Sequence, residues 1–312
     1  MNLRFPHLFA VAAHLVLQSN CMLTQNDIPD KWKSSVSQAW DNAVIRSRDV
    51  LNLESYPNWA LDQIMDGDGT INVCMRWGAN ETLTEDDRNQ IVAVYEQNYQ
   101  SWLGFLPGYD NFPYTQVKSR VTGWAVNDES FFQGSSDGFE IYSNFTDEEG
   151  FPTCNPGCSR HEHPDGDYSS CDGGAQNRFH QFFLLDPIGF GNFTMAAATG
   201  YGFYVGLTGW ETVGSKLPDW PLLLHETGHT FGFPDYLDDG SRNHTICFNL
   251  WLPPNAPAEF VMKPGDYGAH VHEITEMEGW MTRYWWSRFS RLRGWQHDNT
   301  TSSPLPNCTS DN

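Results

Sequence analysis

The segment from Leu222 to Asp235, Leu-Leu-Leu-His-Glu-Thr-Gly-His-Thr-Phe-Gly-Phe-Pro-Asp, is the feature that most constrains how this chain can fold. On an α-helix, two histidines four residues apart leave the same face, so His225 and His229 can bind one metal ion together. Glu226 lies about 100° further round the helix, where its carboxylate can accept a proton from a water molecule at the ion. The spacing therefore predicts a metal-binding helix that carries its own general base.

The residues after His229 predict where the helix ends and where a third ligand comes from. Gly232 can adopt a positive φ, and we expect it to end the helix and turn the chain back. Asp235 then returns to the ion, because three residues span at most about 10 Å. The alternatives are the neighbouring Asp238 and Asp239, or a distant glutamate such as Glu273, Glu276 or Glu278.

The apolar residues on both sides of the motif predict that this helix is buried. Three leucines precede it and two phenylalanines follow it: Leu222, Leu223, Leu224, Phe231 and Phe233. A surface helix with two solvated histidines would not need them, so the flanks favour the metal site.

The first 21 residues have the pattern of a secretory signal peptide. Arg4 supplies the positive start, residues 8–17 form the apolar core, and Cys21 is small enough for the cleavage site. Ten apolar residues are too few for an uncleaved anchor, and no later stretch could cross a membrane. We therefore expect a soluble, exported mature chain.

The cysteines and glycosylation sequons agree with an oxidising, extracellular compartment. Removal of Cys21 with the signal leaves six cysteines for three disulfides: Cys74, Cys154, Cys158, Cys171, Cys247 and Cys308. Six cysteines allow 15 connectivities, and the three cysteines of residues 146–175 cannot all pair with one another. The N-x-S/T sequons are Asn80, Asn144, Asn192, Asn243, Asn299 and Asn307.

Charge and aromatic content limit the partners. A net charge of −21 disfavours nucleic acid and anionic membranes, which repel an acidic protein. The 13 tryptophans are expected mainly in the core and in a cleft, with a glycan-stacking surface as the alternative. The oligomeric state cannot be predicted from the sequence.

Periodicity and turn residues predict the order of elements. Thr84 and Asp87 begin a capped amphipathic helix of about twenty residues, and Asp219 is the expected N-cap of the motif helix. Further helices are expected at 36–51 and 272–293, and strands at 71–77, 117–126, 139–143, 179–185 and 195–205. We divide the chain into a signal peptide (1–21), an N-terminal segment (22–70), a zinc-site domain (71–295) and a polar tail (296–312).

The polar loop 146–175 contains a second group of metal-binding residue types. His161, His163, Asp165 and Asp167 could hold an ion such as Ca²⁺ or zinc, but no terminal acidic residue follows at a recognised spacing. We therefore expect a solvated loop held by disulfides.

Together these residues resemble the metzincin clan of zinc endopeptidases, whose pattern is H-E-x-x-H-x-x-G-x-x-H/D followed by a methionine turn. The first part matches His225 to Asp235, and Met262 in Phe-Val-Met-Lys-Pro-Gly provides the turn. The terminal aspartate is similar to that of the snapalysin-like branch. The resemblance covers residues 71–294 in the order of elements, although only the two short motifs carry it.

The resemblance implies an α+β fold with a twisted, mostly parallel sheet, a long upstream helix, the active-site helix, the methionine turn and a C-terminal helix. It implies Zn²⁺ bound by His225, His229 and Asp235, with Glu226 as the catalytic base and Met262 beneath the ligands. Tyr267 would support the oxyanion, although it follows the methionine by five residues, further than in that pattern.

The expected activity is that of a secreted endopeptidase. It would act on an extended extracellular protein or peptide that lies against an edge strand, for which residues 195–205 are suited. The alternatives are a secreted glycan-binding protein rich in aromatic residues and a hydrolase of non-peptide amides that uses the same zinc site.

Overall fold

The computed structural model describes residues 24–47, 51–186, 196–206, 221–237, 250–251, 257, 260–263 and 273–295. Several sequence predictions fall outside these residues. They are the signal peptide, the tail 296–312, Asp219, Asp238, Asp239, Tyr267, Cys247, Cys308, Asn192, Asn243, Asn299 and Asn307.

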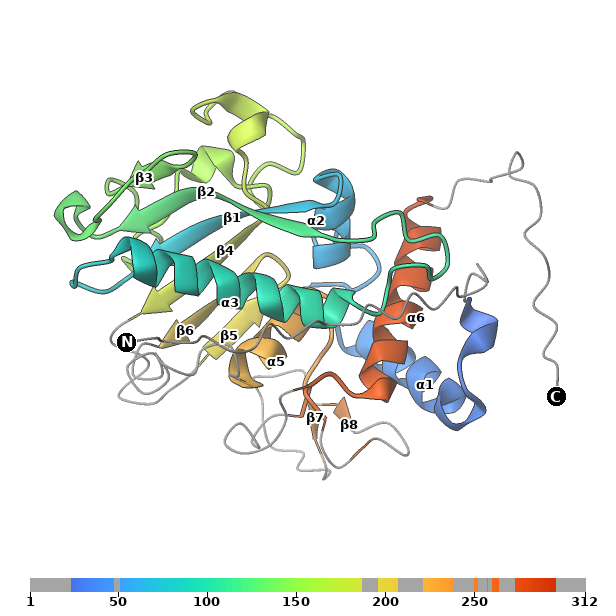
Figure 1. Cartoon of the computed structure of the whole chain (residues 1–312). Helices are drawn as coiled ribbons and strands as arrows, with labels where there is room; N and C mark the ends of the chain where they lie inside the picture. Colours follow the sequence, from blue (N-terminus) through green and yellow to red (C-terminus); the bar gives the residue numbers. More distant parts are fainter. Residues whose placement is uncertain are drawn as a thin grey trace, which may run out of the picture.

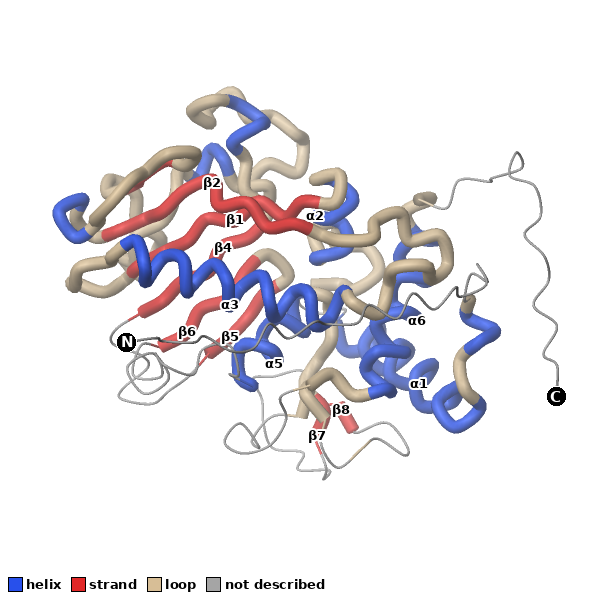
Figure 2. The backbone as a smooth tube through the Cα atoms, viewed as in Figure 1, coloured by secondary structure: helices blue, strands red, loops and turns tan. Residues whose placement is uncertain are grey.

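The described residues build a mixed α/β fold around a six-stranded sheet (Figures 1 and 2). Its strands are β1 (Thr70–Trp77), β2 (Lys118–Val126), β3 (Glu140–Tyr142), β4 (Gln181–Asp186), β5 (Ala196–Thr199) and β6 (Gly202–Gly206). Their order is β3-β2-β1-β4-β6-β5, and every neighbouring pair is parallel except β5 with β6. The expected mostly parallel sheet is present, with β5 as an antiparallel edge strand.

The long helix α3 (Glu85–Leu103) covers one face of this sheet (Figure 1). The Thr84 side chain accepts a hydrogen bond from the Asp87 N–H, and the Asp87 side chain accepts one from Thr84, which confirms the predicted capping box. Tyr95 stacks on Phe183 and Phe203 of the central strands, with ring centroids 6.2 and 5.9 Å away. The apolar side of α3 is therefore buried on β4 and β6.

Two disulfides hold the loop that covers the opposite face of the sheet. Cys74 points away from α3 and pairs with Cys154, while Cys158 pairs with Cys171. The central strand β1 alternates its side chains, so its neighbours Val73 and Met75 belong to the helix-side core instead. Cys74, Cys154, Cys158 and Cys171 thus belong to a second, smaller core on this face, and the two disulfides cross-link it.

Two helices from opposite ends of the chain lie together beyond one end of the sheet (Figure 1). They are α1 (Asp30–Ser47) and α6 (Glu276–Leu292). Trp40 of α1 lies edge-on to Trp285 and Phe289 of α6, with centroids 4.9 and 5.6 Å apart. The short helix α2 (Ala60–Asp66) leads from this region into β1. The N-terminal segment therefore shares one hydrophobic core with the rest of the described chain.

Three predicted helix boundaries were wrong. The first helix begins at Asp30 rather than near residue 36 and ends at Ser47, before residue 51. The last begins at Glu276 rather than near residue 272, because Thr275 and Glu278 form a capping box that sets its first turn.

The predicted single strand at 195–205 is a hairpin. Gly200 and Tyr201 separate β5 from β6, and the Tyr201 N–H donates to the Thr199 hydroxyl in the turn. The apolar pattern of residues 195–205 does not show that the chain reverses. Gly200 and Gly202, which interrupt this pattern, mark the place of the turn. The reversal makes β5 the edge strand among the described strands.

Among the described residues, no helix is both long enough and apolar enough to cross a bilayer. The tryptophans lie largely inside, since nine of them are buried: Trp32, Trp40, Trp59, Trp77, Trp102, Trp124, Trp280, Trp285 and Trp286.

The two disulfides should stabilise the protein unequally. The Cys74–Cys154 link spans 80 residues and the Cys158–Cys171 link spans 13. Loop-closure entropy predicts about 4.5 and about 3 kcal/mol respectively. We therefore expect the C74A/C154A pair to lower the free energy of unfolding in urea more than C158A/C171A does. Equal losses for the two double variants would contradict this entropic ranking.

Candidate metal centre

The motif helix α5 (Pro221–Thr230) is anchored on α3 beside the edge strand. Leu222, Leu223 and Leu224 are buried, as their apolar pattern predicted. Trp102 of α3 donates its indole N–H to the Leu224 carbonyl at 2.9 Å, and Tyr99 joins its hydroxyl to that of Thr230 at 2.9 Å. Apolar burial and two polar contacts thus hold α5 in place.

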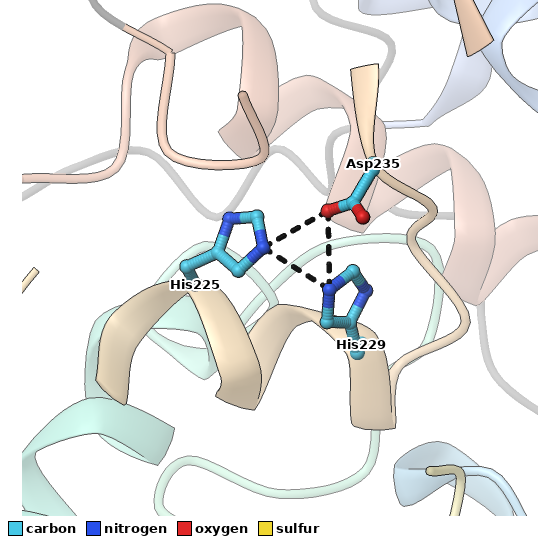
Figure 3. Close-up of side chains that lie close together, drawn as sticks. All are labelled: His225, His229 and Asp235. Carbon is cyan, nitrogen blue, oxygen red and sulfur yellow. Dashed lines mark hydrogen bonds and ion pairs between the residues drawn. The ribbon is translucent and has the colours of Figure 1, made fainter. Parts of the chain in front are cut away.

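The structure brings His225, His229 and Asp235 together at one point (Figure 3). The two imidazole Nε2 atoms lie 3.1 Å apart, and the Asp235 Oδ1 atom lies 3.0 Å from His225 Nε2 and 3.3 Å from His229 Nε2. Among the described residues this is the only His, Cys, Asp and Glu group that could hold a metal. The His225 side chain is 2% exposed, while His229 and Asp235 stay 20% and 18% exposed, so the group opens to solvent on one side.

Backbone carbonyls orient both imidazoles. His225 Nδ1 lies 2.7 Å from the Val261 carbonyl oxygen, and His229 Nδ1 lies 2.7 Å from that of Phe233. A carbonyl oxygen only accepts, so each Nδ1 carries the proton and donates it. Both neutral rings then turn an unprotonated Nε2 toward Asp235. This is the tautomer in which a second hydrogen bond prepares histidine to bind a metal.

With both rings neutral, three electron-rich atoms therefore converge without a hydrogen between them. Asp235 Oδ1 is buried and receives no hydrogen bond among the described residues. Tetrahedral zinc with bonds of 2.0–2.2 Å has ligand atoms about 3.3–3.6 Å apart. The observed contacts of 3.0–3.3 Å are close to that edge length. The donor set and its spacing fit one zinc ion.

The pKa shifts of Asp235 and His229 also indicate that the site favours a positive charge. Burial raises the pKa of Asp235, but the two imidazoles lower it further, to well below its usual range. Burial lowers the pKa of His229, but the adjacent Asp235 carboxylate raises it to about 9, so without a metal ion His229 would hold a proton on Nε2. A single proton bridges only one of the three contacts, whereas one metal ion satisfies all three.

Glu226 lies beside this group without belonging to it. The residue is 3% exposed, and its Oε2 atom is buried with no hydrogen-bond partner among the described residues. Burial raises the pKa of Glu226, the two imidazoles lower it, and the Asp235 carboxylate raises it again. A buried carboxylate with a raised pKa and a free oxygen is suited to accept a proton.

Gly232 turns the chain from α5 back to Asp235. Its φ is +86°, and its N–H donates to the His229 carbonyl at 2.9 Å. A Cβ atom at this position would lie 2.4 Å from Leu53 Cδ1. The turn thus needs glycine for its backbone conformation and for the space beside it.

Met262 lies directly under the helix that carries the histidines. It is fully buried, and a Cβ atom at Gly228 would lie 2.3 Å from its sulfur. The Lys263 N–H donates to the Phe260 carbonyl at 3.1 Å, which closes a turn over residues 260–263. This turn also carries the Val261 carbonyl that orients His225.

The distant glutamates suggested as alternative ligands lie elsewhere. Glu278 is buried and accepts hydrogen bonds from the Met262 N–H and from both the N–H and the hydroxyl of Thr275. Burial raises its pKa to about 7. Glu276 pairs with Lys31, and Glu273 is exposed. Glu278 therefore supports the turn rather than a metal, and spacing along the sequence could not reveal that role.

The histidine and aspartate residues of the 146–175 loop make other contacts instead of a second metal site. His161 stacks on Tyr201 with centroids 3.6 Å apart, and its Nδ1 lies 3.0 Å from the Tyr56 hydroxyl. Asp165 and Asp167 are exposed and accept hydrogen bonds from backbone N–H groups two residues on. Asn80 and Asn144 are exposed.

Comparison with known proteins adds little to this geometry. No protein-family model matches the chain, and no curated protein matches it. Among solved structures it is similar to the crystal structure of archaemetzincin from Methanopyrus kandleri. The two share 13% sequence identity over 70% of this chain and 97% of that chain, with a TM-score of 0.34. Such a distant likeness carries no argument about function, which has to come from the site itself.

Replacement of Gly232 by alanine should disturb the site more than a left-handed glycine elsewhere. G232A combines a left-handed backbone, which costs a residue with a side chain about 1–2 kcal/mol, with the clash against Leu53. The control is G166A, where φ is +77° but nothing lies within 4 Å of the added Cβ. Urea unfolding should show the larger loss for G232A, and only G232A should lose bound zinc. Equal effects of the two variants would refute the role of this turn.

Proposed function

We propose that this protein is a secreted zinc-dependent endopeptidase. The observation that carries the proposal is the convergence of His225 Nε2, His229 Nε2 and Asp235 Oδ1 within 3.3 Å, beside Glu226, whose buried Oε2 has no hydrogen-bond partner among the described residues. Two nitrogens and one oxygen suit zinc, and three protein ligands leave a fourth position for water or substrate, as in catalytic zinc sites. The metzincin-like motif and methionine turn favour the same activity.

Each residue near the site has a separate task in this reaction. The bound ion would supply Lewis acidity, which lowers the pKa of a water and polarises the scissile carbonyl. Glu226 accepts the proton of the attacking water and then donates it to the departing amine nitrogen. The Val261 and Phe233 carbonyls keep the two imidazoles in the tautomer that binds metal.

The edge strand β5 supports an extended peptide as substrate. It lies against α5, and among the described strands only β6 pairs with it, along one edge, so we propose that its other edge pairs with an added substrate strand. Ala196, Ala197, Ala198 and Thr199 have small side chains, and Ala197 is exposed. Natural substrates would be extracellular proteins or peptides rather than nucleic acids, which the net charge of −21 repels.

An extracellular location is proposed from chemistry that agrees with it. The disulfides Cys74–Cys154 and Cys158–Cys171 persist in oxidising compartments. The predicted signal peptide leads there, and the exposed Asn80 and Asn144 can accept glycans. A glycan-stacking function has less support, because nine tryptophans are buried. A hydrolase of non-peptide amides would use the same zinc ligands, and a panel of peptide and acyl-amide substrates separates the two.

Glu226→Gln tests the catalytic assignment. The amide keeps the shape of the carboxylate but cannot accept the proton, so hydrolysis should fall about 10²- to 10⁴-fold. Zinc content should remain one ion per chain, measured by elemental analysis of the dialysed protein. Cleavage of a proteome-derived peptide library compares the rates and reports the preferred cleavage site. Wild-type rates in the variant would overturn the proposed role of Glu226.

Asp235→Asn tests the third ligand. Loss of a direct ligand should weaken zinc binding by more than about 100-fold, the upper range for loss of an outer hydrogen-bond partner. Glu276→Gln is the control, because Glu276 is one of the alternative ligands yet pairs with Lys31 at the surface. Competition with a chromogenic chelator measures both affinities. Unchanged affinity in D235N would exclude Asp235 as a ligand.

A further inference from the structure

Trp59 lies between two turns that matter for the proposed activity. One is the turn at Gly232 that leads to Asp235, and the other is the Gly200 turn that ends the edge strand β5. A Cβ atom at Gly232 would lie 3.5 Å from Trp59 Cδ2, and one at Gly200 would lie 2.9 Å from Trp59 Cε3. The same indole ring therefore contacts the chain beside a metal ligand and the chain beside the substrate strand.

The indole is held firmly in this position. It is 6% exposed, and its Nε1–H donates to the Leu53 carbonyl at 3.1 Å. Leu53 in turn fills the space beside Gly232, where a Cβ atom would lie 2.4 Å from its Cδ1 atom. Tyr56 packs edge-on against the ring with a centroid distance of 5.2 Å. Residues 53–59 thus form a compact wall against the Gly232 turn.

Polar contacts attach residues 53–63 to the end of α6 and to the β5–β6 hairpin. Arg293, which caps α6, donates to the Asp62 carboxylate at 2.8 Å, to the Tyr56 carbonyl at 2.7 Å and to the Glu54 carbonyl. The amide of Gln63 donates to the Gly200 carbonyl at 2.9 Å. Asp62 also accepts the Trp59 N–H at 3.1 Å. The segment is therefore fixed on the α6 side and on the side of the β5–β6 hairpin.

We propose that Trp59 is a positioning residue that sets the Asp235 turn against the end of β5, and that residues 51–66 consequently belong to the working protein rather than to a removable propeptide. This inference rests on the proposed zinc peptidase activity. The physical reason is that each turn contains a glycine, which has no side chain of its own to pack. Their positions relative to each other depend on the ring between them, because close-packed neighbours transmit a volume change to the chain they touch.

The first experiment compares W59F with W124F. Trp124 is also a buried tryptophan, 1% exposed, but it lies on β2, which three strands separate from β5 in the sheet. Both variants lose ring volume in the core, so global stability measured in urea should fall in both. Only W59F should release zinc about tenfold faster to a chelator and change the visible absorption of the cobalt-substituted protein.

Peptide kinetics provide a second readout on the same pair. Because Trp59 also contacts the Gly200 turn, W59F should raise KM for extended peptides, whereas W124F should leave KM within twofold of the wild-type value. Matched metal release, spectra and KM in the two variants would overturn the positioning role. A wild-type protein that binds neither zinc nor cobalt would instead refute the proposed function itself.

The second experiment maps the N-terminus of the active protein. Full-length chain is expressed by a secretory host, the active species is purified, and intact mass with N-terminal sequencing locates its first residue. We expect that species to retain residues 51–66. An active species that begins after Asp66 would overturn the proposal, because it would lack the whole wall.

Discussion

The placement of three electron-rich atoms within 3.3 Å of one another is the constraint on which the rest of the site depends. Neutral imidazoles and a carboxylate gain nothing from such contact unless a cation lies among them. The protein nevertheless turns each Nε2 inward by giving each Nδ1 a carbonyl acceptor. His229 finds its acceptor four residues on, at Phe233, while His225 depends on Val261, which comes 36 residues later. One histidine is thus oriented locally and the other by tertiary structure.

Because His225 is oriented by the distant Val261 carbonyl, the turn at 260–263 has to be held in place, and several residues far from it in the sequence do so. The turn has to hold the Val261 carbonyl at a fixed distance from His225. The close packing of Met262 against Gly228 sets the distance between the turn and the motif helix. Glu278 receives the Met262 N–H and so attaches the turn to the first turn of α6. Tyr236, the residue after Asp235, donates its N–H to the Met262 carbonyl at 2.9 Å. The turn therefore connects the first histidine and the aspartate to one support.

Features that depend on neighbouring residues were predictable from the sequence. The Thr84–Asp87 capping box follows from interactions within a few residues, and the spacing of the motif was enough to bring its His225, His229 and Asp235 side chains together. The supports of the site were not predictable, because Val261, Glu278 and Trp59 act across long separations that no local pattern encodes. The hairpin at Gly200 was missed for a related reason, since apolar runs look alike whether the chain continues or reverses. Three cysteines of one loop cannot all pair with one another, which limited the possible disulfides. Only the fold shows that Cys74 pairs with Cys154.

In the proposed zinc site, charge balance gives a reason for an aspartate in the third ligand position. A divalent ion with two neutral imidazoles and the Asp235 carboxylate carries a net charge of +1, and the ionised Glu226 brings the group to zero. Three neutral ligands would leave a positive charge in a site where His225 and Glu226 are almost fully buried. Uncompensated charge is costly in such surroundings. In the proposed reaction the same balance would leave the ion less positive, so proton removal from water would depend more on Glu226, whose pKa burial already raises. In the proposed site, Asp235 and Glu226 together would therefore balance the charge of the divalent ion, which is why two acidic side chains can lie so close to each other in a buried position.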